Sequence, residues 1–336
     1  MSNNLRSSAN VEEAARKALA GAENVGLFGH ERPDGDCVGA VVAVAIWLRR
    51  LGKRTQVFLP GGVPERYFFL SGGLGLAVNP AASAKLDLAC AIDTANLERL
   101  GEYRKQFEMA PVKMVIDHHP DNSIPADMRW VEEKVSSGAE LIFRLIGEEE
   151  LKNCGERAAF ALYTGLVTDT GRFSYSNTTP EALAQAGKLV GMGARPATLT
   201  DLLYRSRRAE ELLIEGEFLS SLRVYEGGRV LVMSVSNDFM KRFPEISVED
   251  LAARTIEVKG VLVGVMLLEI QPGVVKISLR ARDGIDVGAV ARKIGGGGHF
   301  PASGAKMSGT VESVEAAVLK AIQGALNEAD ETGRNT

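Results

Sequence analysis

Short apolar runs alternate with longer stretches of helical character through the first third of the chain. The apolar runs have the length of β-strands and occupy residues 24–28, 54–59, 86–92 and 112–116. Helices are expected over residues 36–51, where Gly52 is a typical stop, and over residues 96–107. Strand-helix-strand order with largely apolar strands is typical of a parallel sheet covered by helices on both faces. The pattern therefore predicts an α/β domain.

The pattern changes beyond the middle of the chain. Further helices are expected over residues 138–150, 156–168 and 179–191, and residues 194–208, rich in Arg and Thr, are interpreted as a domain connector. Beyond residue 218 the sequence predicts strands over residues 230–235, 258–270 and 274–281, and helices over residues 248–254, 286–294 and 311–327. We therefore expect a smaller second α/β domain, followed by a frayed polar tail after residue 330.

Composition and charge narrow the class of protein. The chain has 336 residues, 45% of them hydrophobic and 24% charged, which is typical of a globular protein with room for two domains. Its formal net charge of -4 argues against a protein that grips long duplex DNA or RNA, because such proteins carry a basic excess. If the protein handles nucleic acid, a short piece held in a pocket fits better.

Targeting signals and cysteine usage point to the cytoplasm. The polar N-terminus does not resemble a signal peptide, and the longest apolar run, residues 38–48, is too short to span a bilayer. The 3 cysteines are widely spaced and form neither a zinc pattern nor a disulfide framework. We therefore expect a cytoplasmic protein with reduced thiols and no membrane partner.

Acidic and imidazole side chains follow the ends of the predicted parallel strands. The residues just past those ends are His30, Asp34, Asp36, Asp93, Asp117, His118 and His119. Because ligands of open parallel sheets bind outside the carboxyl ends of the strands, these side chains are expected to gather at one edge. Three consecutive polar residues after an apolar strand, as at 117–119, are costly to bury unless they are used.

Each acidic residue also has a plain structural alternative. Asp34, Asp36 or Asp93 could cap a following helix, and Asp169 could be a solvated helix end. An acid at a helix carboxyl end, however, opposes the helix dipole unless a cation offsets it. Mixed histidine and carboxylate ligands in this number suit two divalent ions, with manganese as the leading choice and magnesium or cobalt as substitutes.

A glycine loop supplies a second candidate site. Residues 295–298 are glycines, His299 follows them, and a predicted strand that carries Arg280 precedes the helix before the loop. Such a run can be no more than a flexible turn, but its backbone N–H groups can also cradle phosphate oxygens, with Arg280 as a clamp. No Gly-Lys-Ser/Thr closes the loop, so it is not a P-loop.

Together these residues resemble the DHH phosphoesterases with a DHH-associated second domain, in particular the compact bacterial group of nano-RNases and pAp phosphatases. The resemblance covers nearly the whole chain and five motifs in order. They are His30 with Asp34-x-Asp36, then Asp93, Asp117-His118-His119, Asp169-Thr170-Gly171-Arg172-Phe173, and Gly295 to His299. One small departure is Ser303, where many relatives carry Ala.

The resemblance implies a domain plan and a role for each residue. Residues 1–193 would be the catalytic, metal-binding DHH domain, 194–215 a helical linker, 216–330 a substrate-binding DHHA1 domain that closes over the site, and 331–336 a tail. One manganese would be held by His30, Asp34 and Asp93, and the second by Asp36, Asp93, His118 and Asp169. His119, Asp93 and Asp117 would be the catalytic group, with His119 on the substrate side and Asp117 in support. Substrate would be bound by His119, Arg172, Arg280, Gly296, Gly297, Gly298 and His299. Of these, the glycine loop, His299 and Arg280 would bind the phosphate that does not react.

The function implied is a manganese-dependent phosphodiesterase and phosphatase. It would cleave oligonucleotides of about two to five nucleotides to mononucleotides, and pAp to AMP, through a hydroxide activated by two metals. Its partners would be these substrates and no long duplex, with a homodimer as one option for assembly. Three alternatives stay open: a phosphodiesterase of cyclic or linear dinucleotides such as pApA or pGpG, a manganese pyrophosphatase, and a binding module without turnover. The glycine loop argues against the pyrophosphatase, and the complete ligand set argues against the module.

Overall fold

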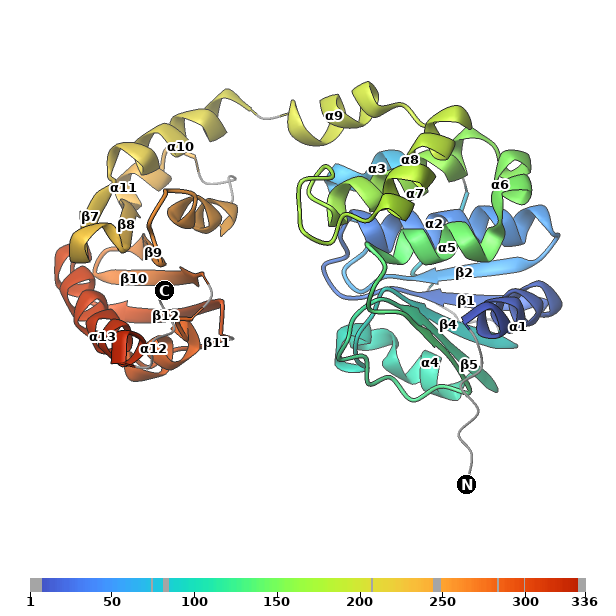
Figure 1. The fold of residues 1–336 in the computed structure, drawn as a ribbon, viewed down its shortest axis with the longest axis horizontal. Helices are drawn as coiled ribbons and strands as arrows, with labels where there is room; N and C mark the ends of the chain where they lie inside the picture. The colour runs from blue at the N-terminus through green and yellow to red at the C-terminus, as the bar shows by residue number, and fades with distance from the viewer. Residues whose placement is uncertain are drawn as a thin grey trace. The chain divides into compact units, whose positions relative to one another are not determined.

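The chain divides into two compact units, residues 1–206 and 207–336, each with its own sheet. A computed structural model describes residues 8–73, 75–80, 85–206, 208–243, 249–282, 284–298 and 300–331 (Figure 1). The α/β class predicted for both halves is confirmed.

A six-stranded sheet in which all neighbouring strands are parallel forms the centre of the first unit. In sheet order its strands are β3 (Ala77–Val78), β2 (Arg54–Phe58), β1 (Asn24–Phe28), β4 (Leu88–Ile92), β5 (Val112–Asp117) and β6 (Met128–Val131). The order reverses between β1 and β4, so this is a doubly wound sheet with its switch point between those two strands. The carboxyl ends of β1, β4 and β5 therefore lie next to one another at the place where such sheets bind ligands.

Helices cover both faces of this sheet. In chain order they are α1 (Ser8–Gly21), α2 (Gly35–Arg50), η1 (Glu65–Tyr67), α3 (Phe68–Ser71), η2 (Glu98–Tyr103), α4 (Arg104–Met109), α5 (Gly138–Ile146), α6 (Glu148–Cys154), α7 (Glu156–Asp169), α8 (Pro180–Gly191) and α9 (Pro196–Tyr204). Alternate strand residues face opposite sides, so Leu27 joins the core under α2, α5 and α7, whereas Phe28 packs with Phe58 and Phe107 on the other face.

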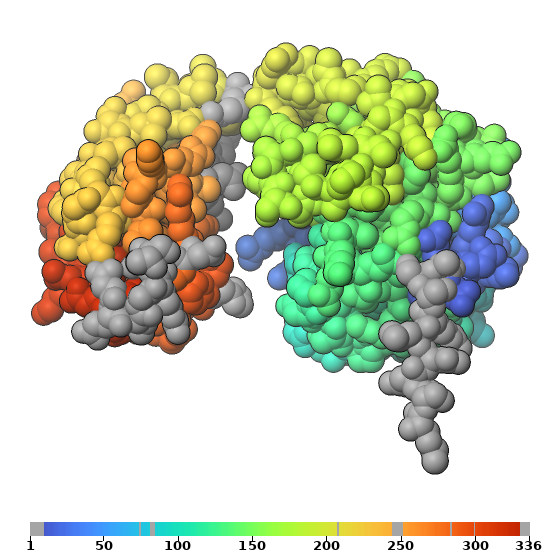
Figure 2. Space-filling view, viewed as in Figure 1, coloured from blue at the N-terminus to red at the C-terminus, as the bar shows by residue number. Residues whose placement is uncertain are grey.

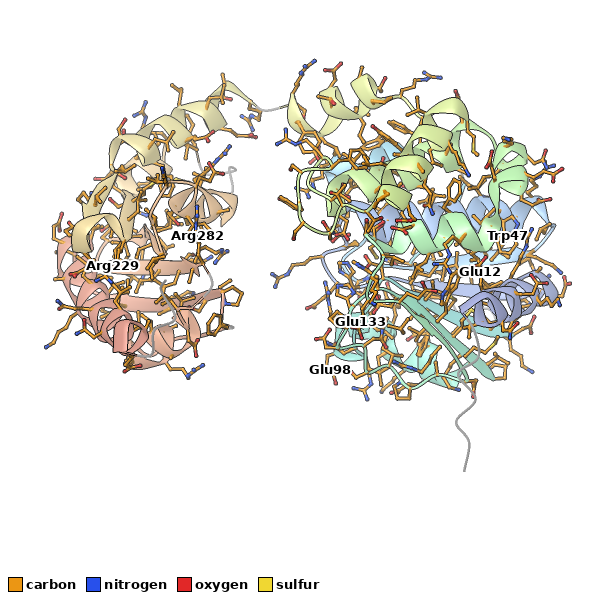
Figure 3. The ribbon with its side chains drawn as sticks, in the orientation of Figure 1. Glu12, Trp47, Glu98, Glu133, Arg229 and Arg282 are labelled. Carbon is orange, nitrogen blue, oxygen red and sulfur yellow. The ribbon has the colours of Figure 1, made fainter. Side chains whose placement is uncertain are left out.

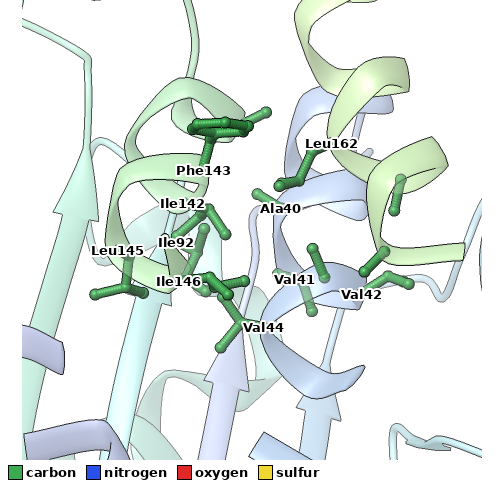
Figure 4. Packing of buried hydrophobic residues seen from close by; sticks show 14 of the residues in the cluster. Ala40, Val41, Val42, Val44, Ile92, Ile142, Phe143, Leu145, Ile146 and Leu162 are labelled. Carbon is green, nitrogen blue, oxygen red and sulfur yellow. The ribbon is translucent and has the colours of Figure 1, made fainter. Parts of the chain in front are cut away.

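The helix α2 is the central element of the larger core. Figure 4 shows Val41 and Val44 of this helix among Ile142 and Ile146 of α5 and Ile92 of β4. Trp47, near the end of α2, is only 2% exposed (Figure 3). Because α2 is buried along nearly its whole length, the residues at its amino end are held firmly against the sheet.

The second unit contains a mixed sheet in the order β11-β12-β10-β9-β8-β7. Its strands are β7 (Arg223–Tyr225), β8 (Val230–Val235), β9 (Val263–Gln271), β10 (Val274–Ala281), β11 (Gly297–Gly298) and β12 (Ala302–Ser308). Its helices are α10 (Ala209–Ser220), η3 (Glu226–Gly228), α11 (Asn237–Met240), η4 (Glu249–Ile256), α12 (Val287–Lys293) and α13 (Val311–Glu331). Residues of α12 and α13 pack on one face and residues of α10 on the other.

Several boundaries differ from the expectations. The helix expected over residues 96–107 begins as the 3-10 helix η2, because Gly101 has a φ of 51° and interrupts a regular helix. The strand expected from residue 258 begins at Val263. Residue 248 lies outside the described residues, and the rest of that expected helix is the 3-10 helix η4. The segment at 194–208, expected to be part of a helical linker, does contain a helix, α9. Among the described residues, none of the helices combines the length and the apolar character that a membrane-spanning segment requires.

Candidate metal centre

His30 and Asp34 stand in the loop between β1 and α2. His30 is 3% exposed, and its Nδ1 lies 2.8 Å from the carbonyl oxygen of Glu31. Its Nε2 lies 3.9 Å from Asp34 Oδ1 and 3.7 Å from Asp93 Oδ2. Burial alone would lower the pKa of His30, but the nearby carboxylates of Asp34 and Asp93 outweigh it and raise the pKa to about 10. The Nε2 atom of His30 is therefore directed at two carboxylates.

The capping alternative applies to Asp34 rather than to Asp36. Asp34 is the N-cap of α2, and its Oδ1 accepts from the N–H groups of Asp36 and Cys37. Burial works to raise the pKa of Asp34, but the nearby imidazole of His30 and the cap hydrogen bonds outweigh it and lower the pKa to about 2. Asp34 can thus serve as both cap and ligand, because only one of its oxygens is used by the helix.

Asp36 is fully buried and is held by a helix more than a hundred residues further along the chain. Its Oδ2 accepts from Gly138 N at 2.6 Å and its Oδ1 from Ala139 N at 2.8 Å, at the start of α5. Burial, reinforced by the charges of Asp93 and Asp169, raises the pKa of Asp36 well above its usual value. Each oxygen keeps a lone pair for a further partner.

Glycines make room for this carboxylate between three helices. A Cβ at Gly39 would stand 2.3 Å from the carbonyl oxygen of Ala161, so α2 and α7 approach as closely as they do only without a side chain there. A Cβ at Gly165 would stand 2.5 Å from Asp36 Oδ1, and one at Gly138 would stand 3.1 Å from Asp36 Oδ2. The contact of α2 with α7 in turn brings Asp36 next to Asp169.

Asp93 follows β4 in a strained conformation. Its φ is 53°, in the left-handed region that non-glycine residues adopt at a cost. Its side chain is 2% exposed, and its Oδ1 makes no hydrogen bond within the described part of the chain. The same Oδ1 lies 3.4 Å from His118 Nε2, whereas Oδ2 points to His30. A buried carboxylate oxygen without a hydrogen bond is costly unless a cation compensates it.

Asp117, His118 and His119 divide into one supporting and two outward-facing residues. Asp117 is fully buried and accepts from His118 N at 2.9 Å, from His119 Nδ1 at 2.8 Å and from Asn122 Nδ2 at 2.6 Å. Burial would raise the pKa of Asp117, but the hydrogen bonds from His119 and Asn122 prevail and lower it. The hydrogen bond with Asp117 raises the pKa of His119. Asp117 therefore orients His119 and favours its protonated form.

Asp169 ends α7, opposite His118. Its Oδ2 lies 3.5 Å from His118 Nε2. Burial raises the pKa of Asp169 to about 6, with the charges of Asp93 and Asp34 acting in the same direction. Burial works to lower the pKa of His118, but the nearby carboxylate of Asp93 and the charges of Asp36 and Asp169 raise it to about 10. The acid at the helix end thus lies among other acids, as expected for a position that a cation stabilises.

The predicted ligand residues form two groups that meet at Asp93. His30 is within ion-pair distance of Asp34 and Asp93, and possible ligand atoms of Asp36, His118 and Asp169 lie within 4.8 Å of one another. One oxygen of Asp93 faces His30 and the other faces His118. Asp93 Oδ1, which accepts no hydrogen bond among the described residues, and the mixed oxygen and nitrogen donors fit divalent cations.

A pocket of about 310 Å³ adjoins this centre within the first unit. Asp34 and Asp169 form part of its wall, and Arg172 lines it as well. Gly171, Arg172 and Phe173 all have φ between 54° and 62°, a run of left-handed backbone directly after Asp169 and Thr170.

The glycine loop of the second unit is more ordered than the sequence suggested. Gly297 and Gly298 form the strand β11, paired with Gly304 and Ser303 of β12. The N–H of Gly296 donates to the carbonyl oxygen of Ala291 at 2.8 Å, so it ends α12 and is not free to bind a phosphate. Gly296 therefore has a structural role here, and its predicted contact with substrate stays a prediction.

The other predicted residues of this unit lie near that short strand. Arg280 of β10 pairs with Ala302 of β12. The preceding residue, Leu279, pairs with Ser303, which on its other side pairs with Gly298 of β11. The hydroxyl of Ser303 donates to the carbonyl oxygen of Val287 at 2.5 Å, a bond that alanine could not make. The predicted substrate contact His299 lies outside the described residues.

Sequence reasoning missed residues whose roles depend on distant contacts. Asn122, five residues after Asp117, bridges Asp117 to the carbonyl oxygen of Thr94 at 2.9 Å. Arg66 and Tyr204 line the pocket beside the metal centre although neither lies in a recognised motif. The unusual content of small residues in α7 near Gly165 was the available signal for close helix packing.

Comparisons with known proteins agree with this geometry. Residues 24–166 match the family described as DHH family, N-terminal domain, and residues 227–328 match the DHHA1 domain. The chain is 30% identical over 302 residues to the bifunctional oligoribonuclease and PAP phosphatase NrnA of Thermus thermophilus, covering 89% of each protein. It is 29% identical over 285 residues to the protein of the same name from Bacillus subtilis, covering 84% of this chain and 88% of that one.

A solved structure shares the fold over nearly the full length. An exopolyphosphatase-related protein from Bacteroides fragilis superposes with a TM-score of 0.81 at 23% identity, covering 97% of this chain and 98% of the other. The chain therefore belongs to the DHH family and carries a DHHA1 domain.

Proposed function

We propose that this member of the DHH family is a manganese-dependent phosphoesterase that hydrolyses short oligonucleotides to mononucleotides and pAp to AMP. The relatives named above as oligoribonuclease and PAP phosphatase support the substrate class. The observation that carries the mechanism is Asp93, whose two oxygens face two separate groups of ligand atoms and whose Oδ1 is buried without a hydrogen bond. We also propose a cytoplasmic location, which the free cysteines support.

Two divalent ions fit the charge of this centre. The proposed ligands include four carboxylates, Asp34, Asp36, Asp93 and Asp169, and His30 and His118 as neutral donors. Ionised, the carboxylates would carry four negative charges, which two divalent cations balance. Such ions would supply an activated water and stabilise negative charge on the phosphoryl group. Magnesium or cobalt can substitute in a donor set of this kind.

His119 is proposed to protonate the leaving oxygen. Its Nδ1 is engaged by Asp117 Oδ1 at 2.8 Å, so Nε2 is the atom left to meet substrate. The side chain is 32% exposed, which makes it reachable by a ligand. The hydrogen bond with Asp117 raises the pKa of His119 and so favours its protonated form. Arg172, Arg280, Gly297, Gly298 and His299 remain proposed substrate contacts.

The test is a hydrolysis panel of pApA, pAp, cyclic di-AMP and pyrophosphate with Mn²⁺. Asp93→Asn is the test variant, because asparagine tolerates left-handed backbone and removes only the charge. Asp87→Asn is the matched control, since Asp87 precedes the same strand at its opposite end. We expect turnover of pApA and pAp that Asp93→Asn abolishes and Asp87→Asn retains. Turnover of pyrophosphate alone, or full activity of Asp93→Asn, would refute the proposal.

A further inference from the structure

The pocket beside the metal centre contains two arginines that the metal chemistry does not use. Arg66 and Arg172 line it together with Tyr204, while Asp34 and Asp169 of the metal centre form part of the wall. All five residues belong to the first unit. A ligand with one group at the metal centre would therefore meet two guanidinium groups in the same pocket.

Three segments that are far apart in the sequence converge on this pocket. Arg66 belongs to η1, Arg172 follows α7, and Tyr204 ends α9. The guanidinium carbon of Arg172 lies 4.9 Å from the centre of the Tyr204 ring. That of Arg66 lies 4.7 Å from the centre of the Tyr67 ring, and its Nη2 donates to the Tyr67 hydroxyl at 2.6 Å. Figure 2 shows the chain around residues 170–206, in yellow-green, as a continuous surface of this unit.

Neither arginine has an acidic side chain within ion-pair distance among the described residues, although Asp34 and Asp169 line the same pocket. Within the part of the chain that the structure describes, Arg66 contacts Tyr67 and Arg172 contacts Tyr204, and neither guanidinium forms an ion pair. Other arginines of the same unit do pair with acids, as Arg104 does with Glu108. Stacking on an aromatic ring fixes the plane of a guanidinium group and leaves N–H donors at its edge, the geometry that binds phosphate.

The backbone around Arg172 is built to hold this side chain in place. Its left-handed turn is pinned by Arg172 N, which donates to the carbonyl oxygen of Val167 at 2.7 Å, and by Phe173 N, which donates to Thr170 Oγ1 at 3.0 Å. Strained backbone of this kind persists only where the surrounding structure imposes it, and it gathers at binding sites.

We propose that Arg66 and Arg172 form a subsite for a second phosphate group of the substrate, next to the phosphate that reacts at the metal centre. This proposal rests on the proposed function and deepens it. It defines the substrate class as short nucleotides that carry two phosphate groups, such as 5′-phosphorylated dinucleotides and nucleoside bisphosphates. Arg66 is the residue that tests it, because it lies in no segment that carries a metal ligand.

The experiment compares two substrates that share the bond to be cleaved and differ by one phosphate. The ratio of kcat/KM for pApA to that for ApA is measured with Mn²⁺ for the wild type, Arg66→Gln, Arg66→Lys and Arg280→Gln. Arg50→Gln is the matched control, because this exposed arginine ends α2 about 21 Å along the helix from Asp36. Binding of pApA and ApA is measured separately by calorimetry with the full chain in Ca²⁺, under conditions in which both are recovered intact.

We expect the pApA to ApA ratio to fall about 10- to 100-fold in Arg66→Gln, the effect of losing one charged hydrogen-bond donor to phosphate. Arg66→Lys should show a smaller fall, since lysine keeps the positive charge but loses the two parallel N–H donors of the guanidinium group. A ratio in Arg66→Gln equal to that of the wild type would overturn the subsite, as would a collapse of the ratio in Arg280→Gln alone.

The binding measurement separates this proposal from the proposed function. If the wild type cleaves neither compound but binds pApA more tightly than ApA in a way that depends on Arg66, the proposed function fails and the subsite stands. If the wild type cleaves both compounds and Arg66→Gln keeps the full preference in binding and turnover, the subsite fails and the proposed function stands.

Discussion

Replacing Gly165 by alanine would test whether the close contact between α2 and α7 holds Asp36 in place. A Cβ at residue 165 would stand 2.5 Å from Asp36 Oδ1 and 2.7 Å from the Cβ of Ala139. Both distances are shorter than atoms in proteins adopt, so Asp36, Ala139 or α7 itself must shift. Because α7 ends in Asp169, a shift of this helix would also move a proposed metal ligand.

The magnitude follows from the contacts that the new methyl group would disturb. Overpacking a dense core costs about 1–3 kcal/mol. Asp36 also accepts two short backbone hydrogen bonds from Gly138 and Ala139, and losing one such bond to a buried charge costs about 1.5–3 kcal/mol. The helix preference of alanine over glycine offsets roughly 1 kcal/mol. We therefore expect the free energy of unfolding of the first unit to fall by about 1.5–5 kcal/mol.

Urea unfolding followed by tryptophan fluorescence measures this change. The chain has 2 tryptophans, Trp47 and Trp130, and both lie in the first unit, so the signal reports that unit alone. Gly187→Ala in α8 is the matched control, because its Cβ would meet nothing within 4 Å and should stabilise the unit by about 0.5–1 kcal/mol. Calorimetry with Mn²⁺ should show one of two ions bound more weakly in Gly165→Ala. An unchanged urea midpoint together with unchanged Mn²⁺ affinity would refute the reasoning.

Four further predictions concern the chemistry of the centre. His119→Asn should lower kcat about 10²- to 10⁴-fold, as for loss of a general acid, while two Mn²⁺ ions still bind by calorimetry; loss of an ion would instead make His119 a ligand. Asn122→Ala removes the 2.6 Å hydrogen bond to Asp117 and should reduce kcat about 10- to 100-fold with little change in KM. A change confined to KM would argue against a role of Asn122 in positioning Asp117. The pKa values of His30 and His118 are raised to about 10, and both side chains must lose a proton to coordinate a metal ion. Mn²⁺ affinity should therefore rise with pH up to about 10, and calorimetry in buffers of different ionisation enthalpy should detect the released protons. A pH-independent affinity would count against both ligands. Removing the ions with EDTA should lower the thermal midpoint of the first unit, because the clustered carboxylates then lack a counter-charge, and adding Mn²⁺ should restore it. Equal midpoints with and without the ions would contradict a metal centre here.

Strands and the residues directly after them were well predicted from local pattern. The strands at 24–28, 230–235 and 274–281 have the predicted bounds, because an apolar run between turn residues is a local property of the chain. The loop predicted over residues 295–298 is right for Gly295 and Gly296, but Gly297 and Gly298 form the strand β11. Its pairing with Ser303 and Gly304 depends on β12, and a strand of small residues carries no apolar signal.

Sequence by itself determined the order of the parallel strands along the chain and the kind of side chain at each carboxyl end. That was enough to bring His30, Asp93 and His118 to one edge, since parallel strands end together. Only the tertiary structure decided how each side chain is used. Asp36 takes its hydrogen bonds from residues 138 and 139, Asp93 divides its oxygens between two groups, and Arg66 meets a pocket shared with Tyr204. These contacts join residues that are distant in the sequence, or depend on helices that pack closely because glycines carry no side chain, and no local pattern encodes them.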